Sequence, residues 1–358
     1  MYDGMMLWYQ RVYALKRKRT WKEAGEKENI KKKKLISMIM ALSLAATLLA
    51  GCGTKDKQGS ENPDDKVYKI GVIQLMQHPA LDAAYEGFVE ALKEEGYEDG
   101  KNISIDYQVA QGEQANCITI ADKFVNDKVD LILAIATPAA QAVASKTTTI
   151  PILVTAVTDP AESGLVASNE KPGGNVSGTS DMTPVKEQID LLHDLLPDAK
   201  NVGVLYCSSE DNSKIQAELA LESLNALQMT GKEYTFSTLD EIQAVVSSMK
   251  GKVDAIYVPT DNKAADGMST ITMLATEAGL PVIVGESGMV DNGGLATFGL
   301  SYLTLGKMTG KQAVSIFKGE AETATMPIGY ISMEECEFAY NKETAEALNI
   351  TIDPSKYQ

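Results

Sequence analysis

The stretch VDLILAIATPAAQAVAS (129–145) begins as an apolar, strand-like run and changes at Thr137-Pro138 into an alanine-rich segment without charge. Strand patterns alternate with helix patterns in this way from Val67 onward, which is typical of parallel βαβ units. Nine runs are interpreted as strands: YKIGVIQL (68–75), ISIDYQV (103–109), VDLILAIA (129–136), IPILVTAV (150–157), NVGVLY (201–206), EYTFST (233–238), VDAIYV (253–258), LPVIVG (280–285) and LATFGL (295–300).

The second group of four strands repeats the first group in order and in flanking detail. Three matched pairs carry the repeat, at offsets of 132, 124 and 130 residues: Ile70–Ile73 with Val202–Leu205, Val129–Ile132 with Val253–Ile256, and Ile150–Ile152 with Leu280–Val282. Such long offsets favour two similar halves over a solenoid of short repeats. The sequence therefore predicts an α/β fold of two similar lobes, each an open parallel sheet flanked by helices.

The last part of the chain predicts a return to the first half. After LATFGL, the stretch 301–320 has the pattern of an amphipathic helix, and MPIGYI (326–331) and EFAYNKETAEALNI (337–350) follow it. The stretch GGNVSGTSDMTP (173–184) is rich in Gly and Ser, and we interpret it as the first join between the halves. We expect a multi-strand hinge between lobe 1 (67–182 plus 299–322) and lobe 2 (183–298 plus 323–358).

Residues 1–51 are interpreted as a signal peptide with an upstream extension. Four lysines (31–34) precede an apolar run of 16 residues (35–50), which is short for a membrane span. The following Leu49-Ala50-Gly51-Cys52 resembles the lipobox of bacterial lipoproteins, which implies that Cys52 carries a lipid anchor; the alternative is an uncleaved signal anchor. Residues 52–66 are polar and predict a flexible tether.

Composition limits the classes of partner and cofactor. The part after Gly51 has 22 basic and 45 acidic residues, a net charge of −23, which argues against binding to nucleic acid. Cys117, Cys207 and Cys336 are far apart and odd in number, which favours core residues over a disulfide or metal framework. Neither His78 nor His193 has a second His at helical spacing, so we expect no metal and no cofactor.

A cleft between the lobes is the expected binding site, because ligands of open parallel sheets bind beyond the carboxyl ends of the strands. The segment Thr137-Pro138-Ala139 starts a helix there. A helix N-terminus leaves backbone N–H groups unpaired, so it can hold a carboxylate without Arg or Lys. The alternative interpretation is a strand-to-helix turn that is packed only for shape.

Acidic residues after other strands are candidates for binding an ammonium group. We favour Asp159 and Asp261, with Glu286 behind them, because a carboxylate makes a charge-assisted hydrogen bond with an ammonium. Each of the three could instead serve as a helix N-cap. Tyr206 is the aromatic residue that a strand end brings to the predicted cleft. The other candidate ligand contacts are Gln74, Met76, His78, Thr158, Ser208, Thr260 and Asn262.

Several phrases together resemble the substrate-binding lipoproteins of ABC importers, in the family described as tryptophan/tyrosine transport substrate-binding. They are HPALD (78–82), ATPAAQAV (136–143), AVTDPAESGLV (156–166), VGVLYCSSEDNS (202–213), YVPTDN (257–262) and GESGMVDNGGLATFGLSY (285–302). The resemblance covers nearly all of 67–345. It implies a type I periplasmic-binding-protein fold with three hinge crossings and a small ligand, an aromatic amino acid, held between the lobes. It also implies delivery to ABC permease subunits at the extracytoplasmic face, and we expect a monomer.

An enzymatic function is not expected. Neither a dinucleotide-binding G-x-G-x-x-G nor a P-loop motif is found, and GESGM (285–289) lacks the final Gly of a nucleophile elbow. Cys117 and Cys207 have no nearby His in the sequence. The alternatives that stay open are a lipoprotein receptor for another small solute, such as a nucleoside or a sugar, and a binding protein coupled to a sensor.

Overall fold

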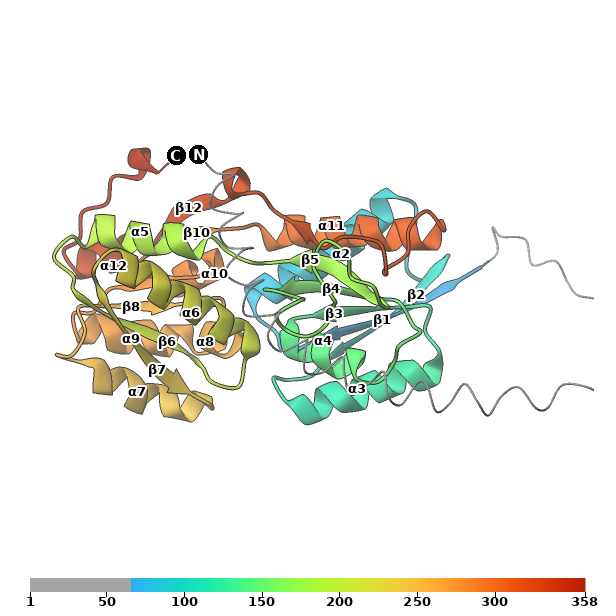
Figure 1. Cartoon of the computed structure of the whole chain (residues 1–358), viewed down its shortest axis with the longest axis horizontal. Helices are drawn as coiled ribbons and strands as arrows, with labels where there is room; N and C mark the ends of the chain where they lie inside the picture. The colour runs from blue at the N-terminus through green and yellow to red at the C-terminus, as the bar shows by residue number, and fades with distance from the viewer. Residues whose placement is uncertain (1–65, 358) are drawn as a thin grey trace, which may run out of the picture. The chain divides into compact units, whose positions relative to one another are not determined.

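Two six-stranded sheets with helices on both faces form the framework of residues 66–357, which a computed structural model describes (Figure 1). The strands are β1 (Tyr68–Gln74), β2 (Ile103–Val109), β3 (Leu131–Ile135), β4 (Ile152–Val157), β5 (Val176–Ser180), β6 (Asn201–Cys207), β7 (Thr230–Phe236), β8 (Ala255–Val258), β9 (Val282–Val284), β10 (Ala296–Gly299), β11 (Gly329–Tyr330) and β12 (Glu337–Tyr340). The α-helices are α2 (Pro79–Glu94), α3 (Gln114–Asp127), α4 (Thr137–Ala144), α5 (Val185–Leu195), α6 (Asp211–Ala226), α7 (Ile242–Met249), α8 (Asn262–Asp266), α9 (Met268–Glu277), α10 (Ser287–Asp291), α11 (Tyr302–Phe317) and α12 (Lys342–Ala347).

The two sheets have the same internal topology, which confirms the predicted fold class. The first sheet has the strand order β11-β5-β4-β3-β1-β2 and the second has the order β12-β10-β9-β8-β6-β7. The registers match as well, because Gly71 pairs with Ile132 in the first sheet and Gly203 pairs with Ile256 in the second. The sheets differ at one edge, where β11 runs parallel to β5 but β12 runs antiparallel to β10.

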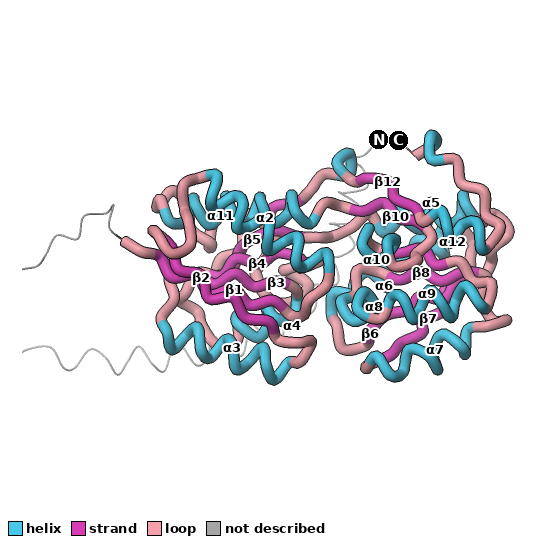
Figure 2. Tube along the Cα trace, turned by 180° about the vertical axis from the view of Figure 1, so that it is seen from behind, coloured by secondary structure: helices cyan, strands magenta, loops and turns pink. Residues whose placement is uncertain are grey.

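Helices cover both faces of each sheet (Figure 2). In the first lobe, α2 and α11 lie on one face of the sheet, and α3 and α4 lie on the other. In the second lobe, α5, α6 and α12 share one hydrophobic core, and α7 to α10 share another core on the opposite face. Strands buried on both faces are expected to be continuously apolar, and β3 (LILAI) is fully buried.

Helices α2 and α11 pack closely because small residues lie where they touch. A Cβ atom added at Gly306 would lie 2.0 Å from the Ala84 carbonyl oxygen, and one added at Gly87 would lie 2.1 Å from the Leu303 carbonyl oxygen. The missing side chains let the two backbones approach each other. Helix α11 is thereby held against α2, and its range confirms the amphipathic helix predicted within 301–320.

The predicted join at 173–184 was wrong in part, because it contains β5. This strand pairs with β4 and all five of its residues are buried. Its sequence, VSGTS, looks like a linker, but Gly178 (φ +138°) is needed there: a Cβ atom would lie 2.1 Å from the Val154 carbonyl oxygen. The first crossing between the lobes is therefore confined to 181–184.

A second difference concerns residues 323–330, which the sequence assigned to lobe 2. Residues 329–330 form β11 in the first sheet, and the Thr323 hydroxyl donates to the Gly174 carbonyl oxygen. These contacts place the third crossing between β11 and β12 instead of at 323. The exact division of the remaining chain into lobes stays a prediction, and the predicted signal peptide, Cys52 and the tether up to residue 65 lie outside the described residues.

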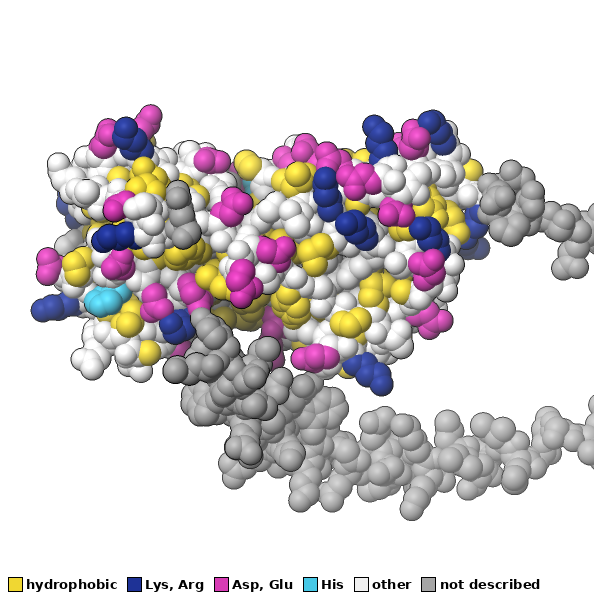
Figure 3. Space-filling model, turned by 90° about the horizontal axis from the view of Figure 1, so that it is seen from above, with side chains coloured by type: hydrophobic (Ala, Val, Ile, Leu, Met, Phe, Trp, Pro, Cys, Tyr) yellow, Lys and Arg dark blue, Asp and Glu magenta, His cyan; other side chains and the backbone are white. Residues whose placement is uncertain are grey.

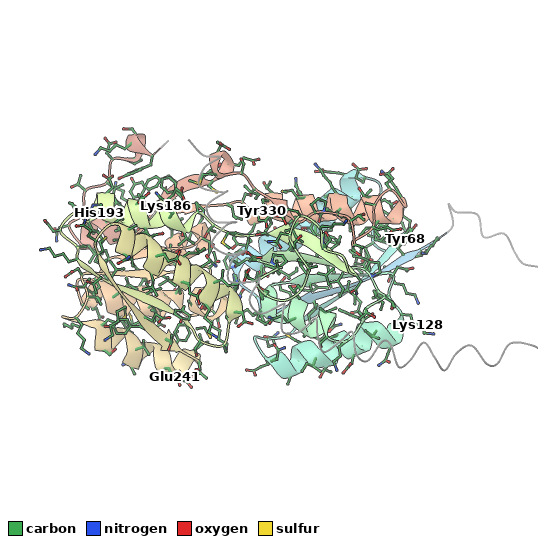
Figure 4. The ribbon with its side chains drawn as sticks, viewed as in Figure 1. Tyr68, Lys128, Lys186, His193, Glu241 and Tyr330 are labelled. Atoms are coloured by element: carbon green, nitrogen blue, oxygen red, sulfur yellow. The ribbon has the colours of Figure 1, made fainter. Side chains whose placement is uncertain are left out.

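Three segments thus connect the lobes: 181–184, 300–301 and 331–336. Both cartoon views show them along the same side of the lobes (Figures 1 and 2). Tyr330 lies at the start of the third segment, whereas His193 is exposed on α5 (Figure 4). Of the helices described between residues 66 and 357, none has the length and apolar character to span a membrane.

Candidate functional site

A cavity of about 300 Å³, counted together with the solvent at its mouth, lies where the two lobes meet. Ends of strands and first turns of helices from both lobes form it, as expected for open parallel sheets. Among residues 66–357, the lining contains three carboxylates and no Lys or Arg. The lining residues are His78, Ala80, Leu81, Ala156, Asp181, Asn212, Thr260, Asp261, Asn262, Ala265, Glu286, Met289 and Tyr302.

Asp181 presents a buried acceptor to this cavity. It directly follows β5 and is 4% exposed. The Tyr302 hydroxyl donates to Asp181 Oδ2 at 2.8 Å, whereas Asp181 Oδ1 has no hydrogen-bond partner. Burial raises the pKa of Asp181 to about 6, against the lowering influence of the Tyr302 and Thr158 hydroxyls. Because an unpartnered buried acceptor is unfavourable, a ligand that donates to Oδ1 would satisfy it.

Glu286 places a second carboxylate near Asp181. It is the N-cap of α10, and its Oε2 accepts a hydrogen bond from the Gly288 amide at 2.6 Å. Burial, against the lowering influence of the Gly288 and Met289 amides and with a contribution from the negative charges of Asp291 and Asp181, raises the pKa of Glu286 to about 7. This end of the cavity therefore favours a positively charged group.

Asn212, in the first turn of α6, adds an acceptor from the second lobe. Its Nδ2 donates to the Thr260 carbonyl oxygen at 3.0 Å, while its Oδ1 has no partner. The buried side-chain atoms of the lining that lack a partner are thus Asp181 Oδ1, Asn212 Oδ1 and His78 Nδ1. An unprotonated His nitrogen, a carboxylate and an amide oxygen all accept hydrogen bonds, so the lining suits a ligand rich in donors.

The carboxylate of Asp261 accepts hydrogen bonds from backbone amides of the second lobe. It caps α8 by accepting from the Ala264 amide at 2.7 Å, and it also accepts from the Cys207 amide at 2.6 Å. Neighbouring Glu210 accepts from the Asn262 amide and side chain and from the Lys263 amide. Burial, followed by the charge of Asp261, raises the pKa of Glu210 to about 7. Asp261 lines the cavity, but both of its oxygens already have protein donors.

Hydrogen bonds join the two lobes around the cavity. His78 Nε2 lies 3.2 Å from Asn262 Oδ1, and Gln141 Nε2 donates to Asp211 Oδ2 at 3.0 Å. The buried Gln216 Nε2 donates to the Thr158 hydroxyl at 3.2 Å. Burial lowers the pKa of His78, so its ring is neutral near pH 7. The contacts are those that would break if the lobes separated.

Five of the fourteen predicted ligand contacts are brought together in the lining: His78, Thr260, Asp261, Asn262 and Glu286. The other nine are not among the lining residues, so their contact with a ligand stays a prediction. They are Gln74, Met76, Thr137, Pro138, Ala139, Thr158, Asp159, Tyr206 and Ser208.

Several of these nine have polar atoms that other protein groups already engage. Asp159 Oδ1 accepts from the amides of Ala161 and Glu162 and from the Asn169 side chain, as in the alternative capping interpretation. Tyr206 is buried in the core of the second lobe and donates to Glu233 at 2.6 Å. Other engaged groups are the Gln74 side chain, bonded to Asp82 and Tyr107, and the Ser208 hydroxyl, bonded to Ser237.

The segment Thr137-Pro138-Ala139 forms the first turn of α4, as predicted. Ala136 precedes it with φ 83° and ψ 151°, a conformation that is essentially restricted to Gly. The Thr137 hydroxyl is buried and has no hydrogen-bond partner. The strained turn therefore holds an unsatisfied hydroxyl next to free backbone N–H groups, although these residues do not reach the lining itself.

The sequence interpretation missed Asp181, Tyr302 and Ala156. Asp181 follows β5, whose Gly- and Ser-rich sequence predicts a linker, and Tyr302 follows β10, a strand outside the matched pairs of the repeat. Ala156 lies in a bulge where the register between β4 and β5 shifts, and its φ of 53° turns the chain into the cavity. An acidic residue at the end of the Gly/Ser-rich stretch was the available signal for Asp181.

Comparison with known proteins gives one consistent family. A family model described as ABC transporter substrate binding protein matches residues 69–355. A curated "Tyrosine-binding protein" of Clostridioides difficile (strain R20291) is 42% identical over 336 residues, which cover 92% of this chain and 96% of that protein.

Solved structures agree with this family. One from Streptococcus pneumoniae, described as an ABC domain in complex with L-Trp, is 39% identical, covers 81% of this chain and 97% of its own, and has a TM-score of 0.78. The ligand-free, open structure of a substrate binding protein with adhesive properties from Clostridium difficile is 44% identical, covers 81% and 98%, and has a TM-score of 0.64. Solute-binding proteins of 14–18% identity, with TM-scores of 0.50 to 0.59, share the type I periplasmic-binding-protein fold alone. This chain belongs to the ABC transporter substrate binding protein family.

Proposed function

We propose that this protein binds an aromatic amino acid in the cavity and presents it to ABC permease subunits. The observation that carries the proposal is Asp181 Oδ1, a buried carboxylate oxygen that has no partner among the described residues, in a lining to which those residues contribute no cationic side chain. An ammonium group supplies three donors, and Asp181 and Asn212 offer acceptors from the two lobes. The tyrosine-binding relative and the L-Trp complex support an aromatic side chain.

The ligand carboxylate is assigned to the first turn of α4. Thr137 offers an unpartnered hydroxyl there, and Ala139 leaves space beside the backbone N–H groups. Such a site needs no Lys or Arg. The turn adjoins the cavity, because the Ala136 amide donates to the carbonyl oxygen of Thr155, the neighbour of the lining residue Ala156. A ligand that contacts both lobes binds the closed arrangement better than the open one, so it shifts the population toward closure.

The proposed location is the extracytoplasmic face of the membrane, with a lipid on Cys52. The proposal rests on the lipobox resemblance and on the family. Receptors for nucleosides or sugars and sensor-coupled receptors are the alternatives. The relatives named for tyrosine and L-Trp favour the amino acid.

A ligand screen tests the proposal. We expect tyrosine, tryptophan or phenylalanine to raise the melting temperature of the purified protein. A ligand at 100 times its dissociation constant adds about 2.7 kcal/mol to the free energy of unfolding. Differential scanning calorimetry with each of the twenty amino acids is the measurement. If none raises the melting temperature, the amino-acid assignment is wrong.

The Asp181→Asn variant tests the ammonium site. We expect it to weaken amino-acid binding by about 1–3 kcal/mol, because the ligand ammonium loses a charged acceptor. Asp254→Asn is the matched control, because its carboxylate accepts from the Lys200 and Asn201 amides away from the lining, and it should lose stability without losing affinity. Isothermal titration calorimetry measures both. Equal losses of affinity in the two variants would remove Asp181 from its proposed role.

A further inference from the structure

His78 combines a fixed partner on one ring nitrogen with a free acceptor on the other. Nε2 lies 3.2 Å from Asn262 Oδ1, across the gap between the lobes. Nδ1 is buried, has no hydrogen-bond partner and belongs to a residue of the cavity lining. A neutral imidazole donates from one nitrogen and accepts at the other, so the contact on Nε2 determines what Nδ1 can do.

Glu210 fixes the orientation of Asn262 and thereby the tautomer of His78. Asn262 Nδ2 donates to Glu210 Oε2 at 2.6 Å, and the Asn262 amide donates to the same oxygen at 3.2 Å. Both Glu210 oxygens face backbone amides, because Oε2 accepts from Asn262 and Oε1 accepts from Lys263. The ionised form, which prevails above the raised pKa of about 7, accepts only. The Asn262 Nδ2 group therefore faces Glu210, and the Asn262 side-chain oxygen faces His78. His78 Nε2 therefore carries the proton, and Nδ1 is the acceptor.

The acceptor on His78 is the one that the proposed ammonium site leaves unused. Of the three unpartnered buried atoms in the part of the lining that the structure describes, Asp181 Oδ1 and Asn212 Oδ1 are assigned to the ammonium group of the ligand. His78 Nδ1 therefore remains for a further donor of the ligand.

We infer that His78 Nδ1 accepts a hydrogen bond from the side chain of the ligand and so selects aromatic amino acids that carry a donor on the ring. This inference rests on the proposed function. The phenol hydroxyl of tyrosine and the indole N–H of tryptophan fit the acceptor, whereas phenylalanine leaves it unpaired. Asn262 and Glu210 are positioning residues that act through the tautomer of His78. The same contact closes the gap between the lobes, so donor recognition and closure share one residue.

The His78→Phe variant tests the inference, because it keeps a flat ring and removes the nitrogen. Dissociation constants of L-tyrosine and L-phenylalanine are measured by calorimetry. We expect the native protein to prefer tyrosine by roughly ten-fold or more, since a buried acceptor left unpaired disfavours phenylalanine. In the variant, the preference should fall to near one. L-tryptophan and its 1-methyl derivative provide a second pair of ligands with and without the donor.

Gln141→Ala is the matched control. It removes another of the hydrogen bonds between the lobes, Gln141 to Asp211, and neither residue belongs to the lining. We expect it to weaken the binding of tyrosine and of phenylalanine equally, so the ratio of their dissociation constants should not change. If His78→Phe leaves the ratio of the tyrosine and phenylalanine dissociation constants unchanged, the inference is wrong but the proposed function still stands. Failure of all these ligands to bind the native protein overturns both.

Nitrogen-15 NMR of labelled histidine gives a measurement on the native side chain. The sequence has two His residues, so His193→Gln, an exposed change on α5, assigns the spectrum. We expect the neutral Nε2–H tautomer for His78 at pH 7, and a shift of the Nδ1 resonance with tyrosine but not with phenylalanine. An Nδ1–H tautomer, or equal spectra with both ligands, overturns the inference.

Discussion

Thr137 is a buried residue whose hydroxyl has no partner within the described part of the chain, 66–357. It follows Ala136, which holds a backbone conformation that favours Gly. A buried polar group without a hydrogen bond lowers stability, so its presence needs a reason other than folding. The proposed reason is the ligand carboxylate, which the hydroxyl and the first turn of α4 would bind together.

The Thr137→Val variant separates stability from binding. We expect the free energy of unfolding of the ligand-free protein to rise by on the order of 1 kcal/mol, because an unsatisfied hydroxyl is removed. Affinity for the amino acid should fall several-fold. Thr155→Val is the control, since the Thr155 hydroxyl accepts a hydrogen bond from Thr179, and this variant should lose stability. Chemical denaturation measures the free energy of unfolding, and isothermal titration calorimetry measures the affinity. If both variants lose the same free energy of unfolding, the prediction is contradicted.

At the residue scale, sequence reasoning found the cavity residues that follow matched strands. Thr260, Asn262 and Glu286 are examples, because the parallel topology alone places them at the same edge of a sheet. It could not foresee which carboxylates would be engaged by their own turns. Asp159 and Asp261 have the same position after a strand, but only Asp261 lines the cavity, and Asp181 alone keeps an unpartnered oxygen among the acids of the lining.

Among the elements, the pair α2 and α11 depends on glycines for its close packing. We expect Gly306→Ala to lower the free energy of unfolding by about 1–3 kcal/mol or more, because the added methyl group would meet the Ala84 carbonyl oxygen. Gly174→Ala is the control, since a Cβ atom there meets nothing within 4 Å. Thermal unfolding of the two variants is the measurement. Similar melting temperatures would show that the helices can move apart without loss.

Strand prediction succeeded where apolar residues dominate and failed where packing needs small ones. The run ISIDYQV was predicted with the bounds that β2 has, because its residues favour strands. The buried strand β5 was missed, since Gly178 and its Ser and Thr neighbours have the composition of a loop. The close contact of Gly178 with the Val154 backbone explains this composition. A contact between residues far apart in the sequence cannot be predicted from the local sequence pattern.

For the whole molecule, buried acids predict how stability depends on pH. Burial raises the pKa of Asp181 to about 6 and those of Glu210 and Glu286 to about 7. Between pH 4.5 and 7 the folded protein therefore holds protons that the unfolded chain releases, and the free energy of unfolding falls as pH rises. His78 acts in the opposite sense, since its lowered pKa makes the unfolded chain bind the extra proton.

We expect the ligand-free protein to melt at a higher temperature at pH 5.5 than at pH 8. Amino-acid affinity should show the opposite trend, because an ammonium binds ionised Asp181 better than the protonated form. Melting temperatures measured with and without ligand across this range test both. If the ligand raises the melting temperature more at acidic pH than at alkaline pH, the assignment of the ammonium group to Asp181 is contradicted.

The face shown in Figure 3 has basic side chains dispersed among acidic ones on both lobes. The Tyr302 hydroxyl donates to Asp181, which joins the residue after the second crossing to the first residue of the first crossing. A ligand that binds Asp181 is therefore held where the chain passes from one lobe to the other. One hydrogen bond thus connects occupancy of the cavity to two of the three segments along which the lobes are joined.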